Sequence, residues 1–270
     1  MNIHIKDIES FEAMKMASLA QCQFGSVLYN TSDEFSDVDI HYVYATSVNE
    51  LNSFLKSHHH LQYKEEGKDH IFVSLHTFLH NLLRGDSTVL FEIVHSDAFK
   101  NTPLSFLYDM KDAFTNYAIV RSYLGFARRD IQHYHKAKGH REQIKSLGHI
   151  LRGYYFAQSI LDGNFRLIND EFLAIFAQLK AISENDFTEK KRWLAHGQKI
   201  VTELREELNH KFNNNTLNLP KYMSVENQVK LDREIQNLMK MPTAWFSKQN
   251  ALSKFDLTPF YDAFENEITY

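Results

Sequence analysis

One stretch near the start of the chain constrains its fold and its chemistry more than any other. Gly25-Ser26 is followed, ten residues after Ser26, by Ser36 and then by Asp37-Val38-Asp39. The run Val38–Tyr44 is rich in aromatic and β-branched side chains and predicts a buried strand. Alternate residues of a strand face the same side, so Asp37 and Asp39 are predicted to project together.

Two adjacent carboxylates call for a cation. Ionised carboxylates side by side repel, and burying them without a partner is costly or raises one pKa. Mg²⁺ (or Mn²⁺) prefers such oxygen ligands and completes its shell with water and substrate phosphates. The Gly25-Ser26 turn lets the backbone approach a phosphate and adds a hydroxyl donor. The alternative is a solvated turn ahead of an ordinary strand.

Gly25-Ser26, the spacer and Asp37-Val38-Asp39 resemble the signature of the DNA polymerase beta-like nucleotidyltransferase superfamily. They are most similar to predicted nucleotidyltransferases found beside RNA ligases in bacterial and phage RNA-repair gene clusters. The resemblance covers roughly Phe24 to Gly163. It implies an α+β fold. A small mixed β-sheet nucleotidyltransferase domain with flanking helices is expected over residues 1–101, and a helical domain covering the nucleotide cleft over 102–270.

A third acid follows from the same resemblance, because the superfamily places another carboxylate on a later, neighbouring strand. Leu61–Glu66 and His70–Ser74 flank Gly67-Lys68 and predict a hairpin. Asp69 stands at the head of the second strand, so the resemblance implies that it is a metal ligand and catalytic residue with the two earlier acids. A simple turn residue beside Gly67 is the alternative.

The segment after the hairpin departs from the relatives in one respect. This chain has Asp86-Ser87 where they often carry Asn-Pro, but Asp and Ser also cap helices, so the turn is expected to persist. Glu92 follows in an apolar run. It is predicted either to orient a basic residue or the metal shell, or to be a buried acid paired to Arg84 or another base.

From Pro103 onward the pattern is helical, with Pro103 suited to a first helical position. Asp162-Gly163 predicts a helix C-terminus, and Asp7 or Ser10 is expected to begin a first helix that includes Leu19. The first strand is expected over Cys22–Val27. Besides the first helix, the sequence predicts two helices before Pro103 and several after it. Their ranges are Ser47–Lys56, Leu75–Leu83, Tyr117–Lys138, Gln143–Leu161, Asp170–Ile182, Thr188–His210, Val225–Lys240 and Pro259–Ile268.

A second set of candidate residues lies on one of these helices. Lys145, His149 and Arg152 are spaced i, i+4 and i+7, which places them on one face. Three such groups repel each other unless an anion lies between them, and a triphosphate is a natural partner. The pattern also resembles the helical half of the RNA-repair relatives, which implies phosphate binding. A solvated basic helix face is the alternative.

The net charge of −4 means that any nucleic-acid contact must come from a local patch. Arg128–Arg141 is basic with interleaved aromatic residues, so it could hold a single-stranded RNA or tRNA-like acceptor, or be a solvated helix end and loop. No feature is specific to DNA.

The composition is ordinary for a globular protein, at 43% hydrophobic and 24% charged residues. The single cysteine, Cys22, excludes an internal disulfide. No signal peptide and no membrane span are predicted, so a cytoplasmic location is expected, in the host cytoplasm for a phage-encoded chain. His58-His59-His60 is interpreted as a solvated strand start rather than a metal site.

Together these features predict a metal-dependent nucleotidyltransferase that binds an NTP, such as ATP. It would move the nucleoside monophosphate to an acceptor hydroxyl and release pyrophosphate. An RNA 3′ end is the first choice of acceptor, a hydroxyl of a partner protein (antitoxin-like) the second, and a small molecule such as an aminoglycoside the third. A non-catalytic nucleotide- or RNA-binding module and a helical scaffold are the alternatives of another class.

Overall fold

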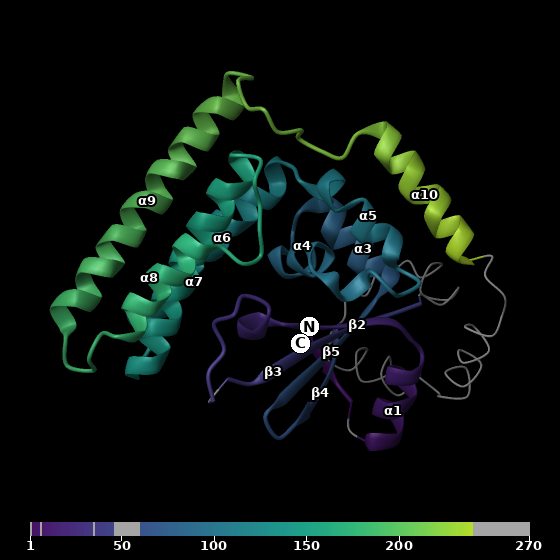
Figure 1. Ribbon diagram of the computed structural model, residues 1–270, viewed down its shortest axis with the longest axis horizontal. Helices are drawn as coiled ribbons and strands as arrows, with labels where there is room; N and C mark the ends of the chain where they lie inside the picture. The colour runs from purple at the N-terminus through teal and green to yellow at the C-terminus, as the bar shows by residue number, and fades with distance from the viewer. Residues whose placement is uncertain (1, 6, 35, 46–59, 240–270) are drawn as a thin grey trace, which may run out of the picture.

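The computed structural model describes residues 2–5, 7–34, 36–45 and 60–239. Its centre is a mixed sheet of five strands in the order β1-β4-β5-β3-β2 (Figure 1). The strands are β1 (Asn2–His4), β2 (Ser18–Phe24), β3 (Val38–Tyr44), β4 (His60–Glu65) and β5 (Lys68–Ser74). The pairs β1–β4 and β3–β5 are parallel, and β2–β3 and β4–β5 are antiparallel. The predicted α+β class is confirmed.

The predicted Asp-x-Asp strand lies inside this sheet, between β2 and β5. Val43 is 1% exposed and Tyr42 is 2% exposed, so β3 contributes buried side chains to both faces of the sheet. On one face, Tyr42 stacks on Phe72 with ring centroids 4.5 Å apart. Burial on both faces explains why this segment is a nearly continuous apolar run.

Helix α1 (Ile8–Met16) covers the Tyr42 face of the sheet through Phe11 and Met14. Asp7 is its N-cap and accepts a hydrogen bond from the Ser10 backbone N–H, so the predicted start is confirmed. Leu19, which was expected on this helix, lies in β2 instead. Helix α1 ends at Met16, with Phe11 and Met14 as its buried residues. The chain then enters the sheet at Ser18, before Leu19 is reached.

The opposite face of the sheet packs against α3 (Leu75–Arg84) and α4 (Thr88–His95) (Figure 1). Ser74 and Ser87 are the N-caps of these helices, so the Asp86-Ser87 turn does begin a helix. Short helices follow: η2 (Asp97–Phe99), α5 (Ser105–Asp109) and η3 (Lys111–Phe114). Pro103 precedes α5 and is not its first residue, because Leu104 is the N-cap.

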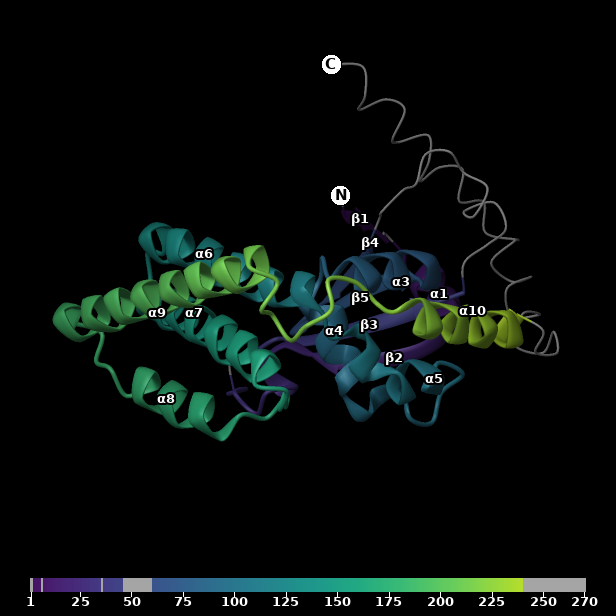
Figure 2. The ribbon, with the colours of Figure 1, turned by 90° about the horizontal axis from the view of Figure 1, so that it is seen from above.

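The remaining described residues are helical, as predicted. They form α6 (Tyr117–Lys136), α7 (His140–Leu161), α8 (Asp170–Lys180), α9 (Phe187–Asn213) and α10 (Val225–Met239). Figure 1 shows α6, α7 and α9 packed beside one another, and Figures 1 and 2 show α10 returning toward the end of the molecule that carries the sheet.

One cluster of buried apolar side chains extends from Leu19 to Leu238 and includes both the sheet and the long helices. The division at residues 101 and 102 stays a prediction. The predicted helices Ser47–Lys56 and Pro259–Ile268, and His58-His59, fall outside the described residues. Among the described helices, none combines the length and the apolar character that a membrane crossing requires.

Candidate active site

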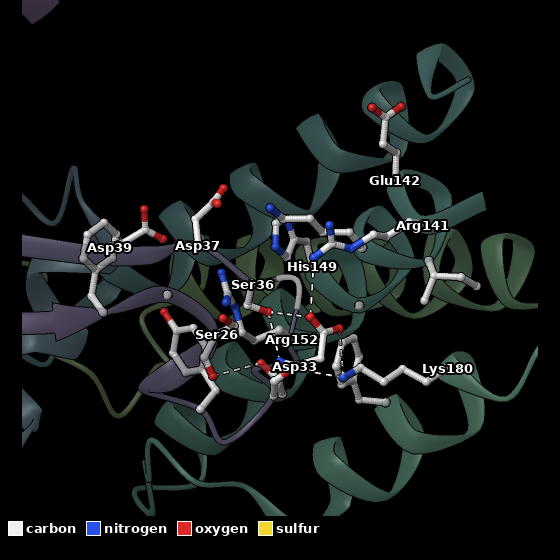
Figure 3. A pocket seen from close by; sticks show the side chains of 18 of the residues that line it. Ser26, Asp33, Ser36, Asp37, Asp39, Arg141, Glu142, His149, Arg152 and Lys180 are labelled. Atoms are coloured by element: carbon white, nitrogen blue, oxygen red, sulfur yellow. Dashed lines mark hydrogen bonds and ion pairs between the residues drawn. The ribbon is translucent and has the colours of Figure 1, made fainter. Parts of the chain in front are cut away.

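A cleft of about 720 Å³ lies between the ends of β2, β3 and β5 and the helices α7 and α8 (Figure 3). Its lining includes every residue that the sequence proposed for the site. These residues are Gly25, Ser26, Asp37, Asp39, Asp69, Lys145, His149 and Arg152. Acids from the sheet and cations from a helix much later in the chain therefore face the same space.

The Gly25-Ser26 turn forms the edge of the cleft next to the acids. β2 ends at Phe24, and Gly25 begins the 3₁₀ turn η1 (Gly25–Val27) with φ of +73°. The expected strand over Cys22–Val27 therefore ends too late, because a residue in the left-handed region interrupts the pleat, and it also starts too late, because β2 begins at Ser18. A Cβ atom on Gly25 would lie 2.7 Å from Oδ2 of Asp39, so only glycine leaves room for that carboxylate.

We expect Gly25→Ala to lower the free energy of unfolding by about 1–2 kcal/mol, because alanine is strained at this φ. It should also lower catalytic turnover at least about tenfold, since the new methyl group displaces Asp39. Gly67→Ala is the matched control, because Gly67 has φ of +71° and open space around it. Equal activity in the two variants, measured beside urea denaturation, would show that the Asp39 contact has no catalytic importance.

The acids of the cleft are close neighbours. Asp39 of β3 pairs in register with Asp69 of the parallel strand β5, and Asp37 precedes Asp39 by one strand period. Figure 3 shows the carboxylates of Asp37 and Asp39 on the same side of the chain. Burial, followed by the charge of Asp69, raises the pKa of Asp39 above 3.8, and Lys145 partly opposes this. The site therefore concentrates negative charge.

Asp69 has a partner of its own. Lys64, directly opposite Asp69 across the β4–β5 pair, places its Nζ 2.9 Å from Oδ2 of Asp69. Within the described ranges, no three His, Cys, Asp or Glu side chains are grouped as a ready-made metal site. Asp37 and Asp39 nevertheless fit Mg²⁺, which needs only one or two protein carboxylates beside substrate phosphates. The third-ligand role of Asp69 stays a prediction.

His149 on α7 differs in charge from its neighbours on the helix. Its Nδ1 lies 3.2 Å from Oδ1 of Asp130, a buried acid of α6. Burial lowers the pKa of His149 below 6.5, and the nearby Arg152 and Lys145 act in the same direction. His149 is therefore neutral at pH 7. A neutral imidazole has a single N–H group, and at Nδ1 this group donates to the carboxylate of Asp130. His149 therefore differs from the cationic group that was one of the two roles expected of it.

The His149 ring should titrate with a midpoint below 6.5, because burial of the imidazole disfavours its charged form. Asp130→Asn should lower this midpoint further, since the hydrogen bond that His149 donates to the carboxylate of Asp130 raises the pKa of His149. The measurement is an NMR titration of the histidine ring signals, with Asp162→Asn at the other end of α7 as control. A midpoint at or above 6.5 would contradict a neutral imidazole in the resting site.

Arg152 lies at the inner end of the helix face. Its guanidinium carbon is 4.2 Å from the centroid of the Tyr29 ring, and Tyr29 in turn donates a hydrogen bond to Oε2 of Glu92. Tyr123 donates to the other oxygen of Glu92 at 2.9 Å. Glu92 is 1% exposed, and burial raises its pKa while the charge of Arg152 opposes the shift. This network joins the loop after η1 to α4, α6 and α7.

Glu92 is buried, as its second interpretation proposed, and the base whose charge acts on it is Arg152, which lines the cleft. Its hydrogen-bond partners are Tyr29 and Tyr123. A role for Glu92 in orienting a base or the metal shell stays a prediction. Arg84 is not the base that compensates it, because Nε of Arg84 lies 2.6 Å from Oδ2 of Asp86. Nothing in the local sequence identified these tyrosines.

The basic stretch Arg128–Arg141 is divided by the structure between the end of α6 and the start of α7. Arg128 and Arg129 are exposed, and Arg141 lines the cleft. The interleaved Tyr134 is only 9% exposed and packs in the core, so it does not offer a ring for base stacking. The cleft also contains residues that the sequence did not single out, including Asp33 and Lys180.

The mixed sheet with paired acids beside a glycine-serine turn, facing a basic helix, defines the polymerase beta-like nucleotidyltransferase class. Over residues 2–238 the chain matches the family model RlaP, described as the RNA repair pathway DNA polymerase beta family. The chain belongs to this family.

No curated protein matches the chain. Among solved structures it is similar to a nucleotidyltransferase-like protein from Exiguobacterium sibiricum. The identity is 12%, the match covers 73% of this chain and 72% of the other, and the TM-score is 0.33. At that TM-score the similarity carries no argument about the cleft.

Proposed function

We propose that the protein transfers a nucleoside monophosphate from an NTP to the 3′ hydroxyl of an RNA. One observation carries the proposal: Asp37, Asp39 and the cationic residues of α7 line the same cleft. A triphosphate needs positive charge along its length, and the polymerase-type reaction needs acids beside the reacting phosphorus. The description of the family as an RNA repair pathway family supports RNA as the acceptor.

In the proposed reaction the acceptor oxygen forms a bond to the α-phosphorus of the NTP. The bond between the α-phosphorus and the bridging oxygen to the β-phosphate breaks, and pyrophosphate leaves with that oxygen. A divalent cation, when bound to Asp37 and Asp39, supplies Lewis-acid charge at the reacting phosphate. The chain's own residues must then orient the triphosphate, take up the hydroxyl proton and balance the charge of the leaving group.

Several residues of the cleft suit these tasks. Ser26 and the backbone at Gly25 lie beside Asp39 and are proposed to hold phosphate oxygens of the triphosphate next to the acids. Lys145 and Arg152 are proposed to balance the charge that develops on pyrophosphate, with the neutral His149 as a hydrogen-bonding group.

The hydroxyl proton needs an acceptor near the acids. Asp69 is proposed for this role because it lies opposite Asp39 in the parallel strand pair. Its ion pair with Lys64 at 2.9 Å fixes the carboxylate at the mouth of the cleft. Lys64 is 57% exposed in its side chain, so solvent can take the proton onward.

The test uses the full chain with Mg²⁺ or Mn²⁺, each α-³²P-labelled NTP in turn, and one RNA in two forms. One form has a free 3′ hydroxyl, and in the other this hydroxyl is blocked by a 3′ phosphate. We expect label on the first RNA only, together with release of pyrophosphate. Label on protein instead would indicate an antitoxin-like activity, and NTP binding without pyrophosphate release would indicate a non-catalytic module. Either result would overturn the proposal.

A further inference from the structure

Three charged residues from distant parts of the chain meet in the cleft. Asp33, in the loop between η1 and β3, places Oδ1 3.4 Å from Nη2 of Arg141 on α7. Its Oδ2 lies 3.6 Å from Nζ of Lys180 at the end of α8. Figure 3 shows Asp33 between these two cations, with Asp37 and Asp39 at the opposite side of the cleft. All three residues line the cleft.

The carboxylate of Asp33 is held in place by its own loop. Ser36 Oγ donates to Oδ1 of Asp33 at 2.9 Å and accepts from the backbone N–H of Asp33 at 3.0 Å. Nζ of Lys180 also donates to the carbonyl oxygen of Thr31 at 3.1 Å. Thr31 in turn donates through its backbone N–H to the carbonyl of Ser26 at 2.9 Å. The loop that positions Asp33 is therefore continuous with the glycine-serine turn.

The two cations have fixed positions of their own. The ring of Phe176 on α8 packs against Gly148 of α7, where a Cβ atom would lie 2.5 Å from the ring. Nζ of Lys180 lies 5.1 Å from the centroid of the same ring. Arg141 is in the first turn of α7. Close packing of α8 on α7 therefore sets Lys180 and Arg141 on either side of Asp33.

The chemistry of this contact matches that of a phosphate. A carboxylate that forms ion pairs with a guanidinium and an ammonium occupies a place where phosphate oxygens bind equally well. The ion pairs are partly open to solvent, with 39% of the Asp33 side chain and 64% of the Arg141 side chain exposed. Ion pairs with this much solvent exposure contribute little free energy, so a polyphosphate of higher charge can replace the carboxylate of Asp33.

We propose that Arg141 and Lys180 form the subsite for the terminal phosphate of the NTP. Asp33 occupies this subsite in the ligand-free protein and leaves it when the nucleotide binds. The inference rests on the proposed function for the choice of an NTP. Figure 3 shows Arg141 and Lys180 across the cleft from Asp37 and Asp39. An NTP with its α-phosphate beside these acids and its triphosphate extended across the cleft would bring its terminal phosphate to the two cations.

The test is Asp33→Asn, which keeps the shape of the side chain and an acceptor for Ser36 but removes the competing charge. Binding of inorganic triphosphate and of AMP to the full chain, with Mg²⁺, is measured by isothermal titration calorimetry. We expect triphosphate to bind about three- to tenfold more tightly, since two exposed ion pairs no longer compete, and AMP to bind as before. Asp97→Asn is the control. It removes the same charge from an ion pair with Lys100, at 2.7 Å, that does not line the cleft.

Arg141→Ala and Lys180→Ala should each weaken triphosphate binding about three- to tenfold. In the protein that carries both alanines, Asp33→Asn should have no further effect. Unchanged triphosphate binding in Asp33→Asn, or an equal change for triphosphate and AMP, would overturn the subsite. These measurements need no acceptor and no turnover. A protein that responds as expected but transfers no nucleotide would therefore keep the subsite and refute only the proposed function.

Discussion

Asparagine in place of Asp39 should lower nucleotide transfer at least about 100-fold, because the divalent cation that this acid is proposed to hold would supply several kcal/mol of charge stabilisation at the reacting phosphate. Asp39 lies at the meeting point of the Gly25 turn, the partner strand residue Asp69 and the charge of Lys145. Asparagine has nearly the same shape but binds a divalent cation poorly. Asp37→Asn should reduce transfer in the same way.

The same substitution should not destabilise the fold. The pKa of Asp39 is raised in the folded state, so the stability that this group contributes is fully present below about pH 3.8 and is lost as the pH rises through the raised pKa. At pH 7 the ionised carboxylate is therefore a cost to the folded protein. Thermal unfolding of Asp39→Asn at pH 7 should occur at the same temperature as in the unchanged protein, or at a higher one.

The control for this pair of measurements is Glu66→Gln, at the exposed turn between β4 and β5 and outside the cleft lining. It removes one negative charge from the hairpin of β4 and β5, whose strand β5 pairs with β3, and should leave transfer unchanged. Normal transfer by the double variant Asp37→Asn, Asp39→Asn would refute the assignment of the cleft as an active site. If Asp39→Asn lost activity and also unfolded at a lower temperature than the unchanged protein, the conclusion that the ionised Asp39 carboxylate destabilises the fold would be wrong.

Removal of the Glu92 carboxylate is expected to have the largest effect on stability. Glu92→Ala should lower the free energy of unfolding by about 3 kcal/mol, because two buried hydroxyls lose their acceptor and a nearby cation loses its opposing charge. The hydroxyls belong to Tyr29 and Tyr123, which are 2% and 1% exposed, and the cation is Arg152. Urea denaturation at pH 7 measures the loss.

Two further variants separate the loss of the Glu92 acceptor oxygens from the loss of an exposed ion pair nearby. Glu92→Gln keeps one acceptor oxygen and should lose less stability than Glu92→Ala. Arg84→Ala should change stability by less than about 1 kcal/mol, because its ion pair with Asp86 is exposed. A similarly small loss in Glu92→Ala would show that the tyrosines and Arg152 do not depend on this acid.

Much of the site was accessible from the sequence because its signals are local. The alternation of Asp37 and Asp39 and the apolar run of β3 are properties of neighbouring residues, and the spacing of Lys145, His149 and Arg152 follows from helix geometry. Helix ends were predictable for the same reason. Asp7 caps α1, and Gly163 follows α7 with φ of +69°.

The features that the sequence did not disclose depend on partners far along the chain. Tyr29 and Glu92 are separated by 63 positions, and Lys180 and Thr31 by 149. The strand β1 has three residues and no pattern of its own, since it is defined by pairing with β4. The neutral state of His149 depends on burial beside α6, which spacing along α7 does not determine.

The residues that line the cleft are far apart in the sequence, and this separation has a consequence for biosynthesis. The acids of the sheet leave the ribosome when Lys145, Arg152 and Lys180 have not yet been translated. A nascent chain thus carries its negative charges before the helices that compensate them, and a fragment ending near residue 101 would lack the whole basic wall. Premature termination there yields a product that keeps Asp37 and Asp39 but lacks Lys145, Arg152 and Lys180, the cations proposed to bind the polyphosphate.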